Sequence, residues 1–295
     1  MKKWTINFDD KTKPAVSVAV AVYNKPRELK MCLEGYRRQS CLKNNPAAFE
    51  LILADDGSSS DIEDIYRKFA GEVSFPCTYL FQEDKGWGKI RMLNAACLEA
   101  LADRIVFTDG DCVPHRHFAR SYAEMMDEDS VYCGRRVDLM GKISAPLSEK
   151  DVASGRLDSL CWHLKAVFGG LVDYGEQGFY FPDWLYGLFT LCMAKNRPSI
   201  LGSNFSIHRK WLKEVNGFDE SYHTPGIGED TDLERRLRMT GVKFRWITHK
   251  AIQYHVWHTL TKVGEQSRET HEALKSKGNK EAVKGLKQFN VFRAP

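Results

Sequence analysis

The chain has 295 residues, of which 43% are hydrophobic and 28% are charged, and its formal net charge is +4. This balance is typical of an ordered globular protein of one large or two small domains, and it excludes a disordered chain. The small positive charge does not indicate nucleic acid as a partner, but it suits a protein that meets phosphate groups or an anionic membrane face.

The eight cysteines form no Cys-x-x-Cys pair, which argues against a zinc knuckle. Cys97 and Cys112 lie in apolar patterns typical of buried free thiols, so a reducing compartment is expected. The first residues show no apolar signal segment, and no apolar run approaches the length of about 18 residues that a membrane span needs. The sequence therefore predicts a cytoplasmic protein, and peripheral contact with the inner membrane is left open.

Strands and helices alternate over the first 107 residues, after a polar and loosely held arm at residues 1–13. The expected strands are residues 16–22, 49–54, 78–81 and 104–107, and the expected helices between them are residues 27–39, 62–69 and 90–102. This rhythm predicts an α/β fold with a doubly wound, mostly parallel sheet and helices on both faces.

Two of these strands run directly into acidic residues. Asp55-Asp56-Gly57-Ser58 follows the second strand, and Asp109-Gly110-Asp111 follows the fourth. A solvated turn with a helix cap explains the serine, but not two adjacent acids, which repel each other unless a ligand or cation uses them. Open α/β sheets bind ligands at the carboxyl ends of their strands, and divalent cations prefer oxygen ligands. The Asp-x-Asp segment is therefore a candidate metal and phosphate site.

The second half of the chain is less regular. A helix is expected at residues 117–126, and further strands are expected at residues 131–134, 200–207 and 242–246. Residues 141–199 are rich in aromatic residues and glycines, and we expect core side chains and long loops there. An acceptor-binding wall of aromatic faces, which would include Trp184, is the alternative. Gly202 stands where a ligand could approach a strand closely.

Glycines also lead into the helix expected before Gly241. Glu229 and Asp230 stand at its N-terminus, where acids complement the helix dipole, but the glycines around them also leave them exposed. His255 and His258 follow further along, and a His-x-x-His pair alone is a weak metal signal. Beyond residue 258 the chain is polar and is expected to form a surface helix or tail.

Together these motifs resemble the family 2 glycosyltransferases of the GT-A fold. The matching segments are Val16-Ser17-Val18 through Tyr23-Asn24, Asp55–Ser58, Asp109–Asp111, Gly217-Phe218-Asp219-Glu220 and Gly228-Glu229-Asp230. The segment from Gly202 to His258 is also similar to the C-terminal half shared by β1,4-galactosyltransferases and chondroitin-polymerase-type enzymes. The resemblance covers about residues 14–260.

The resemblance implies a Rossmann-like GT-A domain over residues 1–258, in which two halves are fused. The nucleotide-sugar half would span about residues 14–115 and the acceptor and catalytic half residues 116–258, with a polar helix or tail over residues 259–295. Residues 141–199 have no counterpart in the resemblance, so the acceptor is not implied by it.

The resemblance also implies the residues that bind the donor. Asp56 would bind the base of the nucleotide, near Tyr23 and Asn24. Asp109 would face the ribose. Asp111 would bind a Mn²⁺ or Mg²⁺ ion that bridges the diphosphate.

The remaining roles follow in the same way. His258 or His255 would complete the coordination of the metal, and the choice between them is open. Asp230 would be the catalytic base, and Glu229 would position the acceptor. Arg91 would replace an arginine that relatives carry directly before the position of Asn94. Gly202, Asn204 and Trp184 are the residues expected near the acceptor or the donor sugar.

The implied activity is an inverting, metal-dependent transfer of a sugar from a nucleotide diphosphate sugar, with a UDP-sugar as the expected donor. The acceptor would be a hydroxyl of a glycan or a lipid-linked molecule, as in the synthesis of bacterial surface polysaccharides. A sugar-nucleotide nucleotidyltransferase is one alternative, but the turn at residues 23–26 lacks its glycine-rich phosphate loop. A dehydrogenase would need Gly-x-Gly-x-x-Gly there. A non-catalytic carbohydrate-binding protein would have no use for both Asp111 and Asp230.

Overall fold

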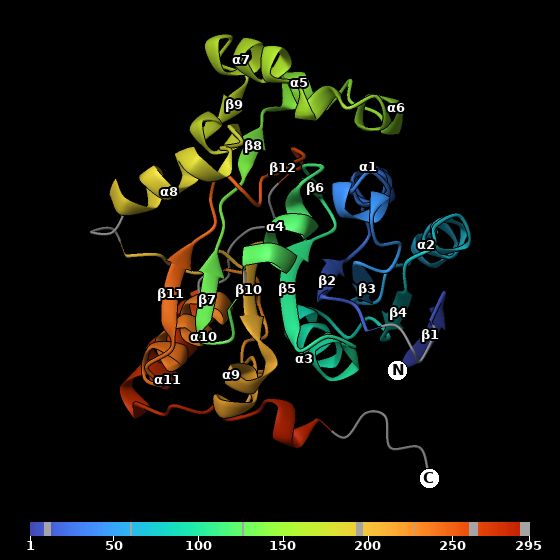
Figure 1. The fold of residues 1–295 in the computed structure, drawn as a ribbon. Coiled ribbons are helices and arrows are strands. Elements are labelled where there is room, and N and C mark those ends of the chain that lie inside the picture. Colours follow the sequence, from blue (N-terminus) through green and yellow to red (C-terminus); the bar gives the residue numbers. More distant parts are fainter. Residues whose placement is uncertain are drawn as a thin grey trace.

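The computed structural model describes residues 1–8, 13–59, 61–125, 127–192, 197–226, 228–259 and 265–289. Its larger sheet consists of β1 (Lys2–Ile6), β2 (Val16–Val22), β3 (Phe49–Asp55), β4 (Cys77–Phe81), β5 (Arg104–Asp109), β7 (Ser130–Cys133), β10 (Asn204–His208) and β11 (Lys243–Trp246). The strand order among the described residues is β1-β4-β3-β2-β5-β10-β7-β11 (Figure 1). Strands β2 to β5 are parallel to one another, whereas β1 and β10 run antiparallel to their neighbours.

The helices cover both faces of this sheet. On one face lie α1 (Pro26–Arg37), α2 (Ile62–Gly71) and α4 (Phe118–Met125), and on the other lie α3 (Lys89–Glu99), α9 (Arg209–Glu214), α10 (Glu229–Arg238) and α11 (Glu265–Lys277). Strand β2 is buried along its whole length, and its valines face the first group while Ala19 and Ala21 face the second. A strand covered on both sides must be apolar at every position, as its sequence is. The predicted fold class is confirmed.

The expectation of a loose arm at residues 1–13 is wrong for residues 2–6, and residues 9–12 of that arm lie outside the described residues. Residues Lys2–Ile6 form the edge strand β1, which pairs antiparallel with β4. Trp4 anchors it, because its ring stacks on Tyr66 and Tyr79 at centroid distances of 5.5 and 5.4 Å. A strand of five residues shows too little alternation to be recognised in the sequence. Its pairing with β4 could not be foreseen either, because β4 lies about 70 residues further along the chain.

The expectation of long loops between residues 141 and 199 is also wrong for the residues that the structure describes. They form α5 (Gly141–Ser144), α6 (Glu149–Ala153), α7 (Leu160–Phe168), β9 (Val172–Asp173) and α8 (Asp183–Cys192). The caps are local: Ser148 and Asp151 form a capping box at α6, and Ser159 caps α7. Helices α5 and α6 are only four and five residues long, and α7 and α8 carry apolar residues on nearly all sides, so none of them shows a clear helical period. We call residues 141–192 the helical segment.

A smaller sheet continues the fold beyond the end of β5. It contains β6 (Cys112–Pro114), β8 (Val137–Leu139), β9 and β12 (Gln253–His255), in the order β6-β12-β8-β9 (Figure 1). An apolar cluster that includes Val113, Val137 and Tyr254 joins it to Met31 of α1 and to residues of the helical segment. The strand expected at residues 200–207 begins only at Asn204.

The prediction that Cys97 and Cys112 are buried free thiols agrees with the structure. The other six cysteines are free as well. No helix in the described part of the chain is both long enough and apolar enough to cross a membrane.

Candidate functional site

The two acidic segments and the turn after β2 meet at one edge of the large sheet. Strand β2 lies between β3 and β5, and its register places Val22 opposite Asp55 and Ala21 opposite Asp109. The turn at residues 23–25 starts at the same level. Together they surround a cavity of about 510 Å³. The parallel register therefore brings together motifs that lie up to about 90 residues apart in the sequence.

One wall of the cavity is built around Asp56, the predicted ligand of the nucleotide base. Its carboxylate accepts hydrogen bonds from Gln82 Nε2 at 2.6 Å and from the backbone N–H of Gly88 at 2.8 Å. A Cβ at position 88 would collide with the Gln82 amide and the Asp56 carboxylate, so a larger residue there would displace the hydrogen bond between them. Burial raises the pKa of Asp56, although the two donors oppose this shift. Tyr23 lies nearby, and its hydroxyl donates to Asp84 at 2.8 Å.

The floor of the cavity carries an ion pair between Lys89 and Asp109, with a separation of 2.7 Å. Burial alone would lower the pKa of Lys89, but the charges of Asp109 and Glu229 hold it above its usual value. The charges of Lys89 and Asp109 also act on the carboxyl group of Glu229. Burial raises the pKa of Glu229 to about 7, against the influence of Lys89 and with that of Asp230. Glu229 is thus half-titrated near neutral pH.

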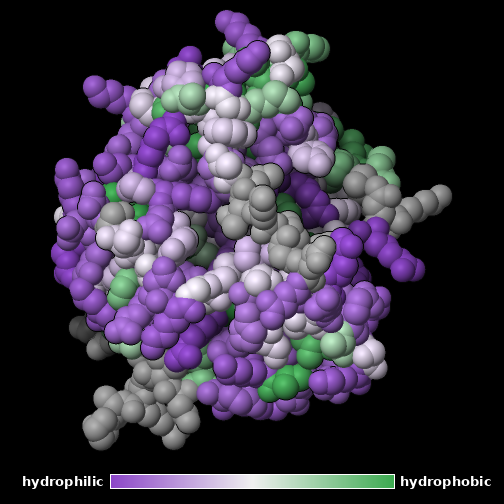
Figure 2. Space-filling model, turned by 180° about the vertical axis from the view of Figure 1, so that it is seen from behind, coloured by the Kyte–Doolittle hydropathy of each residue, from purple (hydrophilic) through white to green (hydrophobic). Residues whose placement is uncertain are grey.

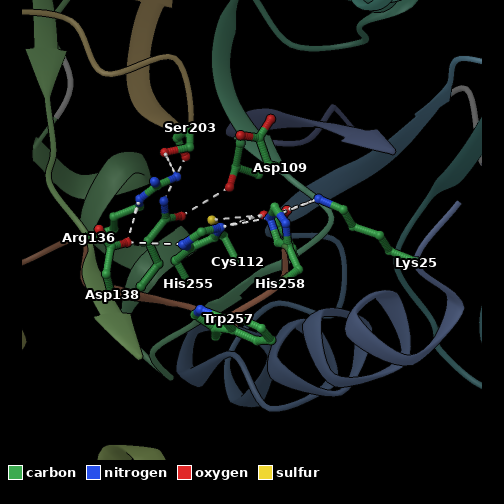
Figure 3. Close-up of polar contacts among 12 residues, drawn as sticks. Lys25, Asp109, Cys112, Arg136, Asp138, Ser203, His255, Trp257 and His258 are labelled. Carbon is green, nitrogen blue, oxygen red and sulfur yellow. Dashed lines mark hydrogen bonds and ion pairs between the residues drawn. The ribbon is translucent and has the colours of Figure 1, made fainter. Parts of the chain in front are cut away.

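Asp111, His255 and His258 form a cluster at the opposite wall, and their ligand atoms all lie within 4.8 Å of one another. The small sheet builds this cluster, because β12 pairs with β6 and places His255 opposite Cys112. Figure 3 shows both histidines and Lys25 converging on the same point. The structure thus brings together the three residues that were predicted to hold a metal.

The hydrogen bonds around the two imidazoles test whether this cluster suits a cation. His255 Nδ1 lies 3.1 Å from Asp138 Oδ1, and His258 Nδ1 lies 3.0 Å from the carbonyl oxygen of Thr259. Both partners only accept, so each Nδ1 carries a proton. His258 Nε2 lies 3.2 Å from His255 Nε2 and 3.1 Å from Asp111 Oδ2, so it gives up the proton it shares with Asp111 when it binds a cation. Two imidazole lone pairs beside a carboxylate are a donor set that fits a divalent cation such as Mn²⁺, with Asp138 orienting one of the rings.

Positive groups already compensate the charge of this cluster. Burial would raise the pKa of Asp111, but its hydrogen bond with His258 and the charges of Lys25 and His255 hold it far below its ordinary value. The hydrogen bond to Asp111 in turn raises the pKa of His258. Asp111 is therefore ionised throughout the physiological range, as a metal ligand must be.

The predicted base lies on a third element. Asp230 belongs to the first turn of α10, and its Oδ2 accepts a hydrogen bond of 3.1 Å from the backbone N–H of Gly202. Two predicted site residues are thus in contact. The preceding Gly228 has a φ of 153°, and a side chain there would collide with Tyr222. The glycine is needed to bring the chain into α10 at this angle.

Comparison with known proteins decides the family. The model described as "Glycosyl transferase family 2" matches residues 17–215, which is more than half of the chain. The chain belongs to glycosyl transferase family 2. A second model, "N-terminal domain of galactosyltransferase", matches residues 191–259 and so includes α10 and the histidine pair. The predicted family, its GT-A fold and the enzyme class are confirmed.

Related proteins include two chondroitin synthases. The one from Escherichia coli is 26% identical over 260 residues, which cover 81% of this chain and 34% of that protein. The one from Pasteurella multocida (strain Pm70) is 28% identical over 280 residues, covering 91% of this chain and 27% of that protein. This glycosyltransferase chain therefore spans about a third or less of the length of these relatives.

Solved structures share the fold at low sequence identity. The mannosyltransferase PcManGT from Pyrobaculum calidifontis, in complex with GDP-Man and Mn²⁺, has a TM-score of 0.53 and 17% identity, covering 93% of this chain and 67% of that one. TarS 1–349 of S. aureus, in complex with UDP-GlcNAc, has a TM-score of 0.50 and 16% identity, covering 83% of this chain and 59% of that one.

Six of the predicted site residues of this glycosyltransferase line the cavity, namely Tyr23, Asp56, Asp109, Asp111, His255 and His258. The other seven are not among its lining residues: Asn24, Arg91, Trp184, Gly202, Asn204, Glu229 and Asp230. Arg91 is on the exposed side of α3, where it stacks on the ring of Phe289. Trp184 is 70% exposed on α8. Asn204 is fully buried, and its amide binds the backbone oxygens of Arg135 and Ala251. The structure gives these three residues no contact with the cavity, and their roles stay predictions.

Other residues of the site were not singled out by the sequence. Lys25 and Arg136 line the cavity, and Asp138 orients His255. Lys25 directly follows Tyr23-Asn24, so its position in the motif was an available signal. Asp138 and Arg136 carried no such signal, because the pairing of β8 with β12 places them there.

Proposed function

We propose that this glycosyltransferase moves a sugar from a nucleotide diphosphate sugar, with a UDP-sugar as the preferred donor, to a hydroxyl group of a glycan or lipid-linked acceptor. The observation that carries the proposal is one cavity that is lined by Asp56, by Asp109 and by the cluster of Asp111, His255 and His258. This set of groups suits a ligand with a base, a ribose and a diphosphate. Synthesis of a bacterial surface polysaccharide is the process it fits, and a lipid-linked acceptor would bring a cytoplasmic enzyme to the inner membrane.

The donor would lie along the cavity in the order of these groups. Asp56 would bind the base beside Tyr23 and Asn24, and Asp109 would face the ribose. Asp111, His255 and His258 would hold Mn²⁺ or Mg²⁺, which neutralises charge that develops on the leaving diphosphate. The Mn²⁺ in the mannosyltransferase structure supports this assignment.

The acceptor hydroxyl must lose a proton as it attacks the sugar. We assign this proton to Asp230, which stands at the N-terminus of α10 beside Gly202. A base on the side opposite the leaving diphosphate supports one displacement, with inversion at the anomeric carbon. Glu229 would position the acceptor.

The first test is a thermal-shift panel of nucleotide sugars with Mn²⁺, with Mg²⁺ and with a chelator. We expect UDP-sugars with Mn²⁺ to raise the melting temperature most, because a ligand that binds only the folded state stabilises it. The Asp111→Ala variant should lose the metal-dependent part of this rise. An unaltered rise that is equally sensitive to chelator in this variant would refute the metal assignment.

An assay of the released products separates the alternative activities. Sugar transfer releases a nucleoside diphosphate, whereas a sugar-nucleotide nucleotidyltransferase releases pyrophosphate when it forms its product. A carbohydrate-binding protein releases neither. Detection of UDP from a UDP-sugar in the presence of a glycan acceptor supports the proposal, and pyrophosphate from a sugar phosphate and UTP would replace it.

A further inference from the structure

The residue before α1 holds a backbone conformation that side chains rarely adopt. Asn24 and Lys25 both have positive φ angles, of 46° and 84°. Ser58 fixes this turn by accepting from the Asn24 N–H at 2.7 Å, and the Asn24 side chain accepts from the Ser59 N–H at 3.1 Å. Strained conformations of this kind persist where the surrounding structure enforces them, and they cluster at functional sites.

The Lys25 side chain extends from this turn into the metal cluster. Its Nζ lies 2.7 Å from Asp111 Oδ2 and 2.9 Å from His258 Nε2 (Figure 3). These are atoms that a divalent cation would need. The single lone pair of His258 Nε2 cannot serve an ammonium group and a divalent cation at once, and beside Asp111 the two positive charges repel each other.

Other cations of the cavity wall are paired differently. Lys89 binds Asp109 at 2.7 Å, and Arg136 binds Asp138 at 2.8 Å. Neither Asp109 nor Asp138 belongs to the metal cluster. Among the described residues that line the cavity, Lys25 is the cationic side chain whose ion pair must break when the cluster binds a metal. Its side chain is also 36% exposed, so it has room to move into the cavity.

We propose that Lys25 is an internal counter-ion of the metal site and a second ligand of the donor. Before a divalent cation binds, its ammonium neutralises Asp111. Once displaced, it pairs with the nearest new negative charge, which on the proposed function is the diphosphate of the donor. Lys25 thereby links binding of the cation to binding of the nucleotide, so that each is favourable chiefly in the presence of the other.

The test uses the full chain, with Mn²⁺ alone and then with UDP at saturating Mn²⁺, both measured by titration calorimetry. Lys25→Met removes the charge and keeps the length of the side chain. We expect it to bind Mn²⁺ alone about tenfold more tightly and UDP about tenfold more weakly than the wild type. Lys25→Gly should show the same two directions and suits the φ of 84° without strain, so it serves if the Met variant folds poorly.

Lys30→Met, on the exposed side of α1, is the matched control and should change neither affinity. If the Lys25 variants bind Mn²⁺ no more tightly than the wild type, the counter-ion role is refuted. If they bind UDP equally well, the diphosphate contact is refuted. A wild-type chain that binds neither Mn²⁺ nor UDP would overturn the proposed function together with this inference, whereas normal binding that is indifferent to Lys25 overturns this inference alone.

Discussion

The carboxyl edge of the large sheet and the helical segment present very different surfaces. At the sheet edge, Asp56, Asp111 and His255 are buried, and each has polar partners within hydrogen-bonding or ion-pairing distance. The helical segment instead exposes apolar side chains, with Phe168 85% and Trp184 70% exposed. Hydrophobic residues are visible at this end of the molecule when it is viewed from behind (Figure 2).

The difference extends to how the two regions are anchored. Helix α10, which carries Glu229 and Asp230, is fixed by a fully buried pair between Arg236 and Asp232 at 2.7 Å. Arg236 also donates to the backbone oxygens of residues 215 and 217. Removing one partner of such a pair typically costs about 3–5 kcal/mol. The helical segment consists of short helices with local caps. We infer that donor chemistry is built into the edge of the large sheet, and that acceptor recognition resides in the helical segment.

The strongest test of this comparison is the same chemical change in both regions. Asp230→Asn should lower turnover by about 10²–10⁴-fold, because it removes the proposed base, and should leave Mn²⁺-dependent UDP binding intact. Asp183→Asn, in the helical segment, alters a 96% exposed carboxylate that pairs with Lys250 at 2.5 Å. Neither residue lines the cavity, so this change should leave turnover with the donor unchanged. Turnover and UDP affinity are measured for both variants. If Asp230→Asn turned over at the wild-type rate, the assignment of Asp230 as the catalytic base would be refuted.

Stability measured as a function of pH tests how much the burial of ionised Glu229 destabilises the folded chain. The pKa of Glu229 is about 7 in the folded chain and about 4.3 in an unfolded one. A raised carboxyl pKa contributes stability that is full below the unfolded value and is lost as the pH rises through the folded value. The wild type should therefore lose stability relative to Glu229→Gln between pH 5 and pH 8.

The expected loss is on the order of 2 kcal/mol, measured as the difference in unfolding free energy between the two chains in urea. Parallel stability curves would show that Glu229 is ionised as readily in the folded chain as in the unfolded one. Turnover of Glu229→Gln also distinguishes the catalytic role of Glu229 from that of Asp230. A loss as large as that of Asp230→Asn would mean that Glu229, and not only Asp230, handles the proton.

The sheet edge was largely predictable because simple periodicities determine it. The apolar strands required a parallel sheet, and a parallel sheet places Asp55-Asp56 and Asp109–Asp111 at one edge. The histidine pair was a weak signal in the sequence. The family resemblance implied that it binds the metal, and the structure brings it to Asp111 because β12 pairs with β6 and places His255 beside that residue.

Other features could not be predicted, for physical reasons. Lys25 meets His258 across 233 residues, and such a contact depends on topology and not on local pattern. The amide of Asn204 could bind either a ligand or the backbone, and the sequence does not distinguish the two. In the structure its nitrogen donates to backbone oxygens and its oxygen accepts from the Tyr122 hydroxyl at 2.6 Å. The helical segment gave no periodic signal because α5 and α6 are about one turn long and α7 and α8 are apolar on nearly all sides.

The smallest expected effect concerns Trp184, and it tests whether the helical segment binds the acceptor. Trp184 lies on α8 outside the cavity wall, so it can touch only an acceptor that extends beyond the cavity. With a long glycan acceptor, Trp184→Ala should raise the acceptor KM about two- to tenfold, as loss of one aromatic contact would. The KM for the donor should not change, and neither should the KM for a monosaccharide acceptor.

Phe168→Ala on α7 is the control, because it removes another exposed ring of the helical segment. The unfolding free energy of both variants should stay within about 0.5 kcal/mol of the wild type, as is usual for exposed positions. Equal KM values for long and short acceptors in Trp184→Ala would place the acceptor elsewhere. The proposal that the helical segment binds the acceptor would then be refuted. The assignments at the edge of the large sheet would not be affected, because other experiments test them.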